Sequence, residues 1–216
     1  MTNNIRRPID FKLYAITNRL LCEPHALHDV IHDLLEAGVT AIQLREKDLG
    51  DLEYFHLAEP IAGLCQTYSA RLFVNSRAKV ALELGAAGLH LPASTPPIKR
   101  IKAETGKGLL IGCSIHSPIE AQAREKEGAD FVTFSPIFPS ASKPGYGPTV
   151  GIKQLEALAS SIEIPVFALG GISPDLVPEC IGAGAHGVAV MSGVMSLETG
   201  ITQAREYLRA LEEHKD

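Results

Sequence analysis

The sequence contains no tryptophan, and its four cysteines are widely spaced. Cys22, Cys65, Cys113 and Cys180 form no C-x-x-C pair, so we expect neither a zinc site nor a disulfide framework. Reduced cysteines are usual in a reducing compartment, and we therefore expect a cytoplasmic location. No apolar run approaches the roughly 20 residues of a membrane span. The first residues also lack the apolar core of a signal peptide.

An excess of positive charge is missing as well. The chain has 20 Lys and Arg against 25 Asp and Glu, a formal net charge of −5. It therefore lacks the basic surface typical of nucleic-acid-binding proteins. The expected partner is a small molecule, not nucleic acid or a membrane, and homo-oligomerisation stays open. The length of 216 residues fits one domain, so we predict a single domain over 1–216, with 1–10 as a polar lead-in.

Apolar runs of strand length alternate with helical segments along the chain. The predicted strands cover 11–16, 39–44, 71–74, 88–91, 109–113, 130–134, 166–172 and 187–193. The predicted helices cover 24–36, 51–68, 77–84, 97–104, 152–160 and 199–213, and two more begin at 117 and 173. The helix over 51–68 is predicted to be disturbed at Pro60. Such alternation with short connections indicates a parallel sheet. Eight units predict an α/β fold of one (β/α)8 TIM barrel.

A short repeat marks the ends of four predicted helices. It reads Glu36-Ala37-Gly38, Leu84-Gly85-Ala86, Glu127-Gly128-Ala129 and Ala183-Gly184-Ala185. The spacing is roughly one strand–helix unit, which supports a repeating architecture. A doubly wound open sheet is the competing architecture. Against it, no G-x-G-x-x-G follows the first predicted strand.

Small residues end the last two predicted strands. Gly170 and Gly171 follow the seventh, and Met191 and Ser192 follow the eighth. In a TIM barrel the turns after the last two strands are the usual phosphate site, because backbone N–H groups point at the anion there. We therefore predict that these four residues bind phosphate. The alternative is that the glycines only make tight turns.

Other polar residues stand near the carboxyl ends of predicted strands, where TIM-barrel sites lie. They are Gln43, Arg45, Lys47, Asn75, Ser76, His90, Ser94, Thr95, Ser114, His116, Ser140, Ser142 and Lys143. The last three belong to a loop rich in Pro, Gly and Ser. That loop is predicted either to close over an anion as a lid or to be an ordinary mobile loop.

Gln43, Arg45 and Lys47 alternate along the chain, so they face the same way if the second strand continues. Two cations and an amide beside a phosphate site indicate an anionic substrate. The alternative is a salt bridge at the barrel rim with Glu46 or Asp48.

The histidines have different predicted roles. His116 follows a strand end and is either a general base or a support for the neighbouring helix. His90 lies inside a predicted strand, which favours a packed, hydrogen-bonded side chain over a catalytic one. His25, His28 and His32 have helical spacing, and a solvated helix face is favoured over a surface metal site.

Taken together, these residues resemble the thiamine phosphate synthase/TenI family of (β/α)8 barrels, over nearly the whole chain. The resemblance is carried by 43–47 (Gln-Leu-Arg-Glu-Lys), Val74-Asn75, 87–91 (Ala-Gly-Leu-His-Leu), 111–114 (Ile-Gly-Cys-Ser), 136–143 (Pro-Ile-Phe-Pro-Ser-Ala-Ser-Lys) and 168–172 (Ala-Leu-Gly-Gly-Ile). Each motif is weak alone, whereas the order of all of them is specific.

The synthase branch joins a pyrimidine diphosphate to a thiazole phosphate and releases diphosphate. The resemblance implies that the pyrimidine diphosphate would be held by Gln43, Arg45, Lys47, Asn75 and Lys143. It implies that Ser140 and Ser142 line the thiazole side, and that the thiazole phosphate meets Gly171, Met191 and Ser192. Ser114 belongs to the substrate-binding candidates. Lys47 and His116 are the candidate catalytic residues.

Two departures from the synthase pattern concern its metal. The aspartate that follows the strand-three asparagine in that branch is Ser76 here. The second aspartate of that branch corresponds to the segment Pro92–Thr95, which contains no aspartate. In synthases these carboxylates hold Mg²⁺, which prefers hard oxygen ligands. The TenI branch includes a metal-independent tautomerase whose catalytic histidine stands where this chain has Pro136.

The sequence therefore predicts a protein of thiamine biosynthesis that binds thiazole phosphate. The first choice is a TenI-like thiazole tautomerase with no cofactor and no metal. One alternative is a thiamine phosphate synthase whose Mg²⁺ is held largely by substrate and water. The other is a non-catalytic regulatory protein that keeps the phosphate site.

Overall fold

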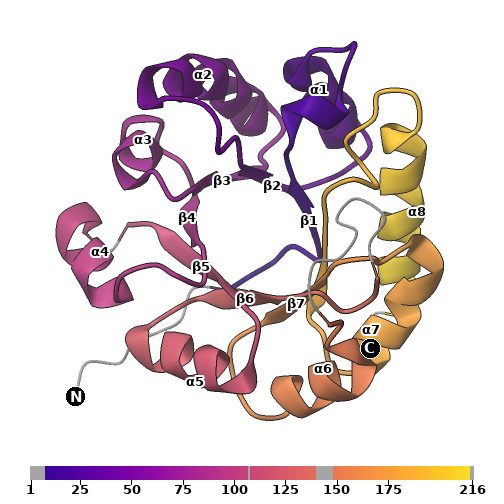
Figure 1. The fold of residues 1–216 in the computed structure, drawn as a ribbon. Helices are drawn as coiled ribbons and strands as arrows, with labels where there is room; N and C mark the ends of the chain where they lie inside the picture. The colour runs from indigo at the N-terminus through magenta and orange to yellow at the C-terminus, as the bar shows by residue number, and fades with distance from the viewer. Residues whose placement is uncertain (1–7, 107, 140–147, 215–216) are drawn as a thin grey trace.

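The computed structural model describes residues 8–106, 108–139 and 148–214. Eight parallel strands form a closed barrel in sequence order, and Figure 1 shows it along its axis with the helices outside. The strands are β1 (Leu13–Ile16), β2 (Ala41–Leu44), β3 (Arg71–Asn75), β4 (Gly88–Leu91), β5 (Leu110–Ile115), β6 (Phe131–Phe134), β7 (Val166–Leu169) and β8 (Gly187–Val190). The predicted TIM barrel is confirmed.

Helices fill the connections between the strands. They are α1 (Leu27–Glu36), α2 (Asp51–Thr67), α3 (Ala78–Glu83), α4 (Ile98–Thr105), α5 (Pro118–Glu127), α6 (Gly151–Ala159), α7 (Val177–Gly182) and α8 (Gly200–Glu212), with 3₁₀ turns η1 (Arg19–Leu21) and η2 (Pro174–Leu176). α2 continues through Pro60, so the predicted disturbance does not end the helix. In the described part of the chain, no helix is long and apolar enough to cross a membrane.

The predicted helix-end repeat forms the same turn four times. Gly38, Gly85, Gly128 and Gly184 all have positive φ. In each case the following residue donates its N–H to a carbonyl five residues back, as Val39 does to Leu34 at 3.0 Å. This is the Schellman hydrogen bond, which favours glycine because other residues are strained at positive φ. The repeat therefore ends each helix and directs the chain into the next strand.

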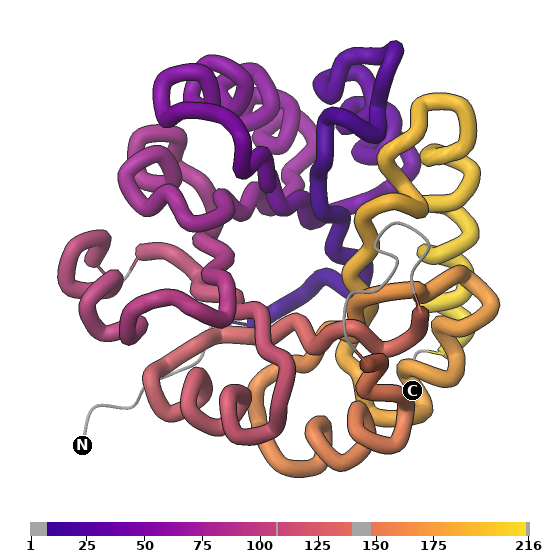
Figure 2. Tube along the Cα trace, viewed as in Figure 1, coloured from indigo at the N-terminus to yellow at the C-terminus, as the bar shows by residue number. Residues whose placement is uncertain are grey.

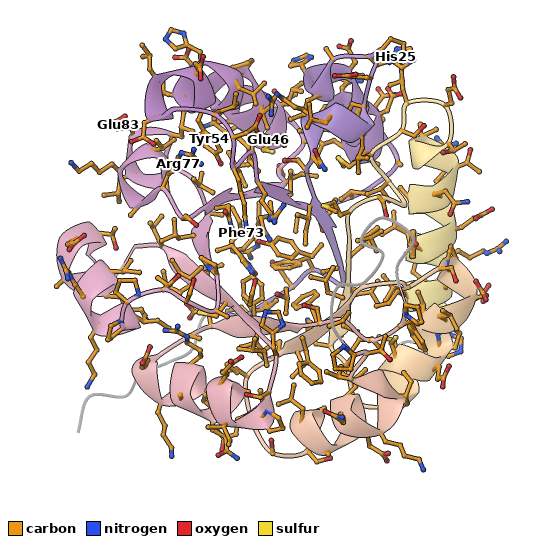
Figure 3. The ribbon with its side chains drawn as sticks, viewed as in Figure 1. His25, Glu46, Tyr54, Phe73, Arg77 and Glu83 are labelled. Carbon is orange, nitrogen blue, oxygen red and sulfur yellow. The ribbon has the colours of Figure 1, made fainter. Side chains whose placement is uncertain are left out.

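Aromatic side chains fill the inside of the barrel. Phe11, Tyr14, Phe73, Phe131 and Phe167 are each at most 1% exposed, and their neighbouring ring centroids lie 5.1–6.0 Å apart. Figure 3 shows Phe73 pointing into the ring of strands. Edge-to-face and tilted pairs at these distances are favourable, so the interior is a packed core and not a channel.

Residues 8–12, directly before β1, close the end of the barrel opposite the carboxyl ends of the strands. Figure 2 shows this segment crossing the ring before it enters β1. Ile9 is 8% exposed and belongs to the interior cluster with Phe11. Ile9 was predicted to belong to a polar lead-in, but its side chain is buried in the core. Phe11 was predicted to begin the first strand, and it lies before β1.

Two predicted helix starts differ in detail. The Ser117 hydroxyl accepts a hydrogen bond from the Glu120 N–H at 3.3 Å, so the predicted cap of α5 is present. Ser173 makes no such side-chain bond, and the chain forms η2 before α7 begins. β7 and β8 end at Leu169 and Val190, earlier than predicted, so the glycine and serine turns that follow belong to loops.

Candidate functional site

The main cavity lies at the carboxyl ends of the strands and has a volume of about 760 Å³. Most predicted site residues line it, namely Gln43, Arg45, Lys47, Asn75, His90, Ser114, His116, Gly170, Gly171, Met191 and Ser192. Ser76, Ser94 and Thr95 are not among the lining residues. Ser140, Ser142 and Lys143 lie outside the described residues. Among the described lining residues there is no aspartate or glutamate.

Two cations stand at the β2 side of the cavity. β2 ends at Leu44, before the predicted alternation is complete, yet Gln43, Arg45 and Lys47 all line the cavity. The nearby charge of Arg45, with some burial, lowers the pKa of Lys47. Two neighbouring cations that line a cavity attract an anionic ligand to it.

The acidic neighbours of these cations are bound elsewhere. Glu46 is 2% exposed and accepts from the Thr17 hydroxyl at 2.6 Å. The Arg19 guanidinium contacts Glu46 at 3.3 Å and holds Asp48 through two bonds of 2.7 and 2.6 Å. The predicted alternative, a salt bridge from Arg45 or Lys47 to Glu46 or Asp48, is therefore wrong for the described residues.

Free backbone donors stand at the β7 and β8 side of the cavity. β7 pairs with β8 so that Leu169 lies beside Ala189, and the turns after both strands meet. Among the described residues, the N–H groups of Gly171, Ser192 and Gly193 donate to no other residue. Such donors suit a phosphate oxygen. Figure 1 shows α7 and α8 outside this part of the barrel.

Gly171 is glycine because of its neighbouring loop. Its φ is +65°, and a Cβ there would overlap the carbonyl oxygens of Phe138 and Pro139. The loop after β6 is bonded to this turn, since the Phe138 N–H donates to Gly170 O at 3.0 Å. A side chain at position 171 would therefore displace this loop, whatever the cavity binds.

Buried polar side chains form the floor of the cavity. Asn75 Nδ2 donates to Gln43 Oε1 at 3.3 Å, while the buried Nε2 of Gln43 has no partner in the described chain. His90 Nδ1 lies 3.3 Å from the Tyr14 hydroxyl and its Nε2 lies 3.1 Å from Ser114 Oγ. An unpartnered buried donor is costly, so Gln43 Nε2 is a good donor for a ligand acceptor.

His90 is neutral in this floor. Burial lowers its pKa to about 3, with a further lowering by the charge of Arg45. The prediction of a packed, hydrogen-bonded histidine is confirmed. Thr133 Oγ1 lies 3.5 Å from His90 Nε2. Tyr14 and Thr133 were not predicted as site residues, since their runs read simply as apolar strands, and their polar atoms meet His90 only in the closed barrel.

His116 lies at the rim of the cavity on an exposed loop. Its Nδ1 is 2.8 Å from Ser135 O, and its backbone N–H donates to Glu120 at 2.6 Å. A carbonyl oxygen only accepts, so Nδ1 carries the proton of the neutral ring and Nε2 carries the lone pair. This geometry suits a base, and it also ties the start of α5 to β6.

The surface histidines do not form a metal cluster. Within the described chain, no group of three His, Cys, Asp or Glu side chains is arranged to hold a metal ion. His28 lies beside Asp29 at 3.3 Å, whereas His32 lies beside Asp33 at 3.5 Å and its Nε2 contacts the Tyr68 hydroxyl at 3.2 Å.

Comparison with known proteins identifies the family. A family model described as thiamine monophosphate synthase matches residues 13–194. The chain belongs to the thiamine phosphate synthase/TenI family. A Geobacter sulfurreducens protein, whose name assigns thiamine-phosphate synthase only provisionally, is 42% identical over 203 residues, covering 94% of this chain and 95% of that protein.

Other members of the thiamine phosphate synthase/TenI family extend the match. A Pyrococcus furiosus protein named thiamine-phosphate synthase is 36% identical over 210 residues, 97% of this chain and 98% of its own. The structure titled thiamine phosphate pyrophosphorylase from Pyrococcus furiosus superimposes with a TM-score of 0.84 at 35% identity, covering 94% of this chain and 96% of that chain.

The cavity residues of this family member do not fit Mg²⁺. Magnesium is usually held by one or two carboxylates, which the described lining residues lack. Residues 140–147 contain no Asp or Glu in their sequence. Ser76 and Thr95, where the family resemblance places the synthase aspartates, do not line the cavity, and the Thr95 hydroxyl donates to Pro92 O at 2.7 Å.

Proposed function

We propose that this chain binds a thiazole phosphate and catalyses a metal-independent proton transfer on it, as a thiazole tautomerase. The observation that carries the proposal is the charge of the cavity. Its described lining residues include Arg45 and Lys47 and no carboxylate. Such a cavity attracts an anionic ligand without a metal ion to neutralise it.

The phosphate of the ligand would bind at the turns after β7 and β8. The N–H groups of Gly171, Ser192 and Gly193 donate to no other described residue there, and no side-chain charge is required for them to bind an anion. Arg45 and Lys47 line the same cavity at the β2 side and would receive the carboxylate of a thiazole carboxylate phosphate.

His116 would transfer the proton. With Nδ1–H bound to Ser135 O, the Nε2 lone pair is free to remove one proton from the thiazole ring, and the resulting imidazolium returns one proton at the exocyclic carbon. One proton leaves and one is returned, so no oxidant, metal or second substrate is required. Lys47 would stabilise the negative charge that develops between the two steps.

Thiamine phosphate synthase is the second candidate, and the names of the relatives favour it. In that reaction Arg45 and Lys47 would bind the diphosphate, with Mg²⁺ held largely by substrate and water. A third candidate is a non-catalytic protein that binds thiazole phosphate for regulation.

One experiment separates the three. The purified chain is given thiazole carboxylate phosphate with and without EDTA, and tautomerisation is followed by the absorbance of the aromatic product. In parallel, diphosphate release is measured with both synthase substrates and Mg²⁺. Tautomerisation unaffected by EDTA supports the proposal. Mg²⁺-dependent diphosphate release would replace it with the synthase, and tight binding with no turnover would leave the regulatory protein.

A further inference from the structure

The segment that carries the two cavity cations is also rich in carboxylates. Residues 45–53 contain Arg45 and Lys47 together with four acidic residues. None of the four pairs with either cation in the described structure, because each has another partner. Those partners are Thr17 and Arg19 for Glu46, Arg19 for Asp48, Arg77 for Asp51, and the Gly50 N–H for Glu53.

The β3 side of this segment is held by Arg77. Its guanidinium lies 4.2 Å from the centre of the Tyr54 ring and contacts Asp51 at 3.0 Å. It also donates to the carbonyl oxygens of Glu46 and Leu49. Figure 3 shows Glu46, Tyr54 and Arg77 grouped near α2 and α3. The backbone on this side is therefore fixed independently of Arg19.

Glu46 is also held without the Arg19 side chain. Its carboxylate accepts from the Thr17 hydroxyl and from the Arg19 backbone N–H at 3.2 and 3.1 Å. Asp48 is different, since its side chain is 55% exposed and both of its oxygens are bound by the Arg19 guanidinium. Removal of that guanidinium would release Asp48 alone, one residue from Lys47.

We propose that Arg19 is a positioning residue that binds the Asp48 carboxylate and so prevents it from neutralising Arg45 and Lys47. The bidentate geometry holds the carboxylate more firmly than a single contact from a lysine would. The two cavity cations then stay available for an anionic ligand. The inference rests on the anion-binding role of the cavity in the proposed function, and not on the proton transfer.

The test measures the affinity of inorganic diphosphate by calorimetry at low ionic strength. Arg19→Gln should weaken binding about tenfold, because the released carboxylate of Asp48 is adjacent to Lys47 in the chain and free to turn toward the two cations. The double variant Arg19→Gln/Asp48→Asn should return the affinity to within about threefold of the parent. Arg100→Gln is the control, since it removes an arginine with an exposed partner, Glu104, on α4.

The double variant distinguishes charge from structure. If Arg19 only supported the loop, removal of the Asp48 charge would not restore binding, and the proposal would be overturned. An unchanged affinity in Arg19→Gln would overturn it as well. The loss in Arg19→Gln should also shrink at 0.5 M salt, where charges are screened beyond a few ångströms. A loss that persists at high salt counts against the proposal.

Two further variants secure the result. Lys47→Gln should itself weaken diphosphate binding, and an unchanged affinity there would remove the premise. Asp48→Asn alone keeps the Arg19–Glu46 contact and should change affinity less than about twofold, because its charge is already neutralised by Arg19. A tenfold gain would mean that Asp48 already screens the cations and would refute the proposal. If the diphosphate affinities change as expected but the parent chain shows no tautomerisation, only the proposed function is refuted.

Discussion

The Nδ1 atom of His116 lies 2.8 Å from the carbonyl oxygen of Ser135, which joins the loop after β5 to the end of β6. The contact selects one tautomer of the neutral ring, because only a protonated Nδ1 can donate to a carbonyl. It also holds the ring at the rim of the cavity, with Nε2 as the remaining acceptor. The same bond thus orients the side chain and prepares it to accept a proton.

Replacement of His116 tests its role as the base. His116→Asn should reduce tautomerisation by roughly 100- to 10,000-fold, the usual contribution of a general base. Affinity for the thiazole phosphate should change little, since the phosphate turns and the cations are untouched. Steady-state kinetics and calorimetry measure the two effects, with His28→Asn on the outer face of α1 as the control. Equal rates in His116→Asn and the parent would make His116 a structural residue.

A charge placed at the turn after β8 tests the phosphate site. Ser192 is exposed and lines the cavity, so Ser192→Asp should fold normally and repel the phosphate. Affinity for thiazole phosphate should fall by about tenfold or more. Ser192→Ala should bind almost as the parent does, because the donors are backbone N–H groups. Gln66→Glu adds the same charge on the outside of α2 and serves as the control. If Ser192→Asp binds with the parent affinity, the phosphate lies elsewhere.

The buried His90 predicts a pH dependence of stability. Its pKa is about 3 in the folded chain and near 6.5 when unfolded, so only the unfolded chain takes up this proton between those values. The contribution of neutral His90 is complete above pH 6.5 and is lost as the pH falls toward 3. Its slope is at most about 1.4 kcal/mol per pH unit in that window.

Urea unfolding at several pH values between 4 and 6.5 measures this slope. His90→Gln should show a shallower loss of stability on acidification than the parent, because the glutamine does not titrate. His28→Gln, on the exposed face of α1, should leave the parent slope unchanged. Parallel curves for His90→Gln and the parent would show that His90 titrates similarly in both states.

Two glycines predict opposite effects of the same substitution. A Cβ at Gly112 in β5 would overlap the Phe131 ring and approach His90 Nδ1 at 2.8 Å. Gly112→Ala should therefore destabilise the chain by about 1–3 kcal/mol, the usual effect of overpacking a core. Gly63 lies inside α2 with nothing within 4 Å of its Cβ position, so Gly63→Ala should stabilise by up to about 1 kcal/mol. Chemical denaturation of both variants measures the difference, and similar shifts of one sign would contradict the packing argument.

The positions of the cavity residues were largely predictable from the sequence. Gln43 lies near the end of one apolar strand, Arg45 and Lys47 follow it, and Gly171 and Ser192 belong to the turns after two others. Parallel strands in a closed barrel bring their carboxyl ends to one face, so residues that follow different strands must meet there. The helix-end glycines were predictable for a local reason, because a Schellman turn needs only a few consecutive residues.

The partners of the charged side chains were decided by tertiary structure. In the sequence Glu46 and Asp48 stand beside Arg45 and Lys47, yet both are bound by Arg19, 27 and 29 residues away along the chain. Residues 45–48 follow the end of β2, and the parallel pairing of β1 with β2 brings the loop after β1 against the loop after β2. Closure of the barrel places Tyr14 beside His90. Periodicity and turn residues thus determined the barrel and its carboxyl-end face, whereas contacts between distant loops decided which charges that face leaves free.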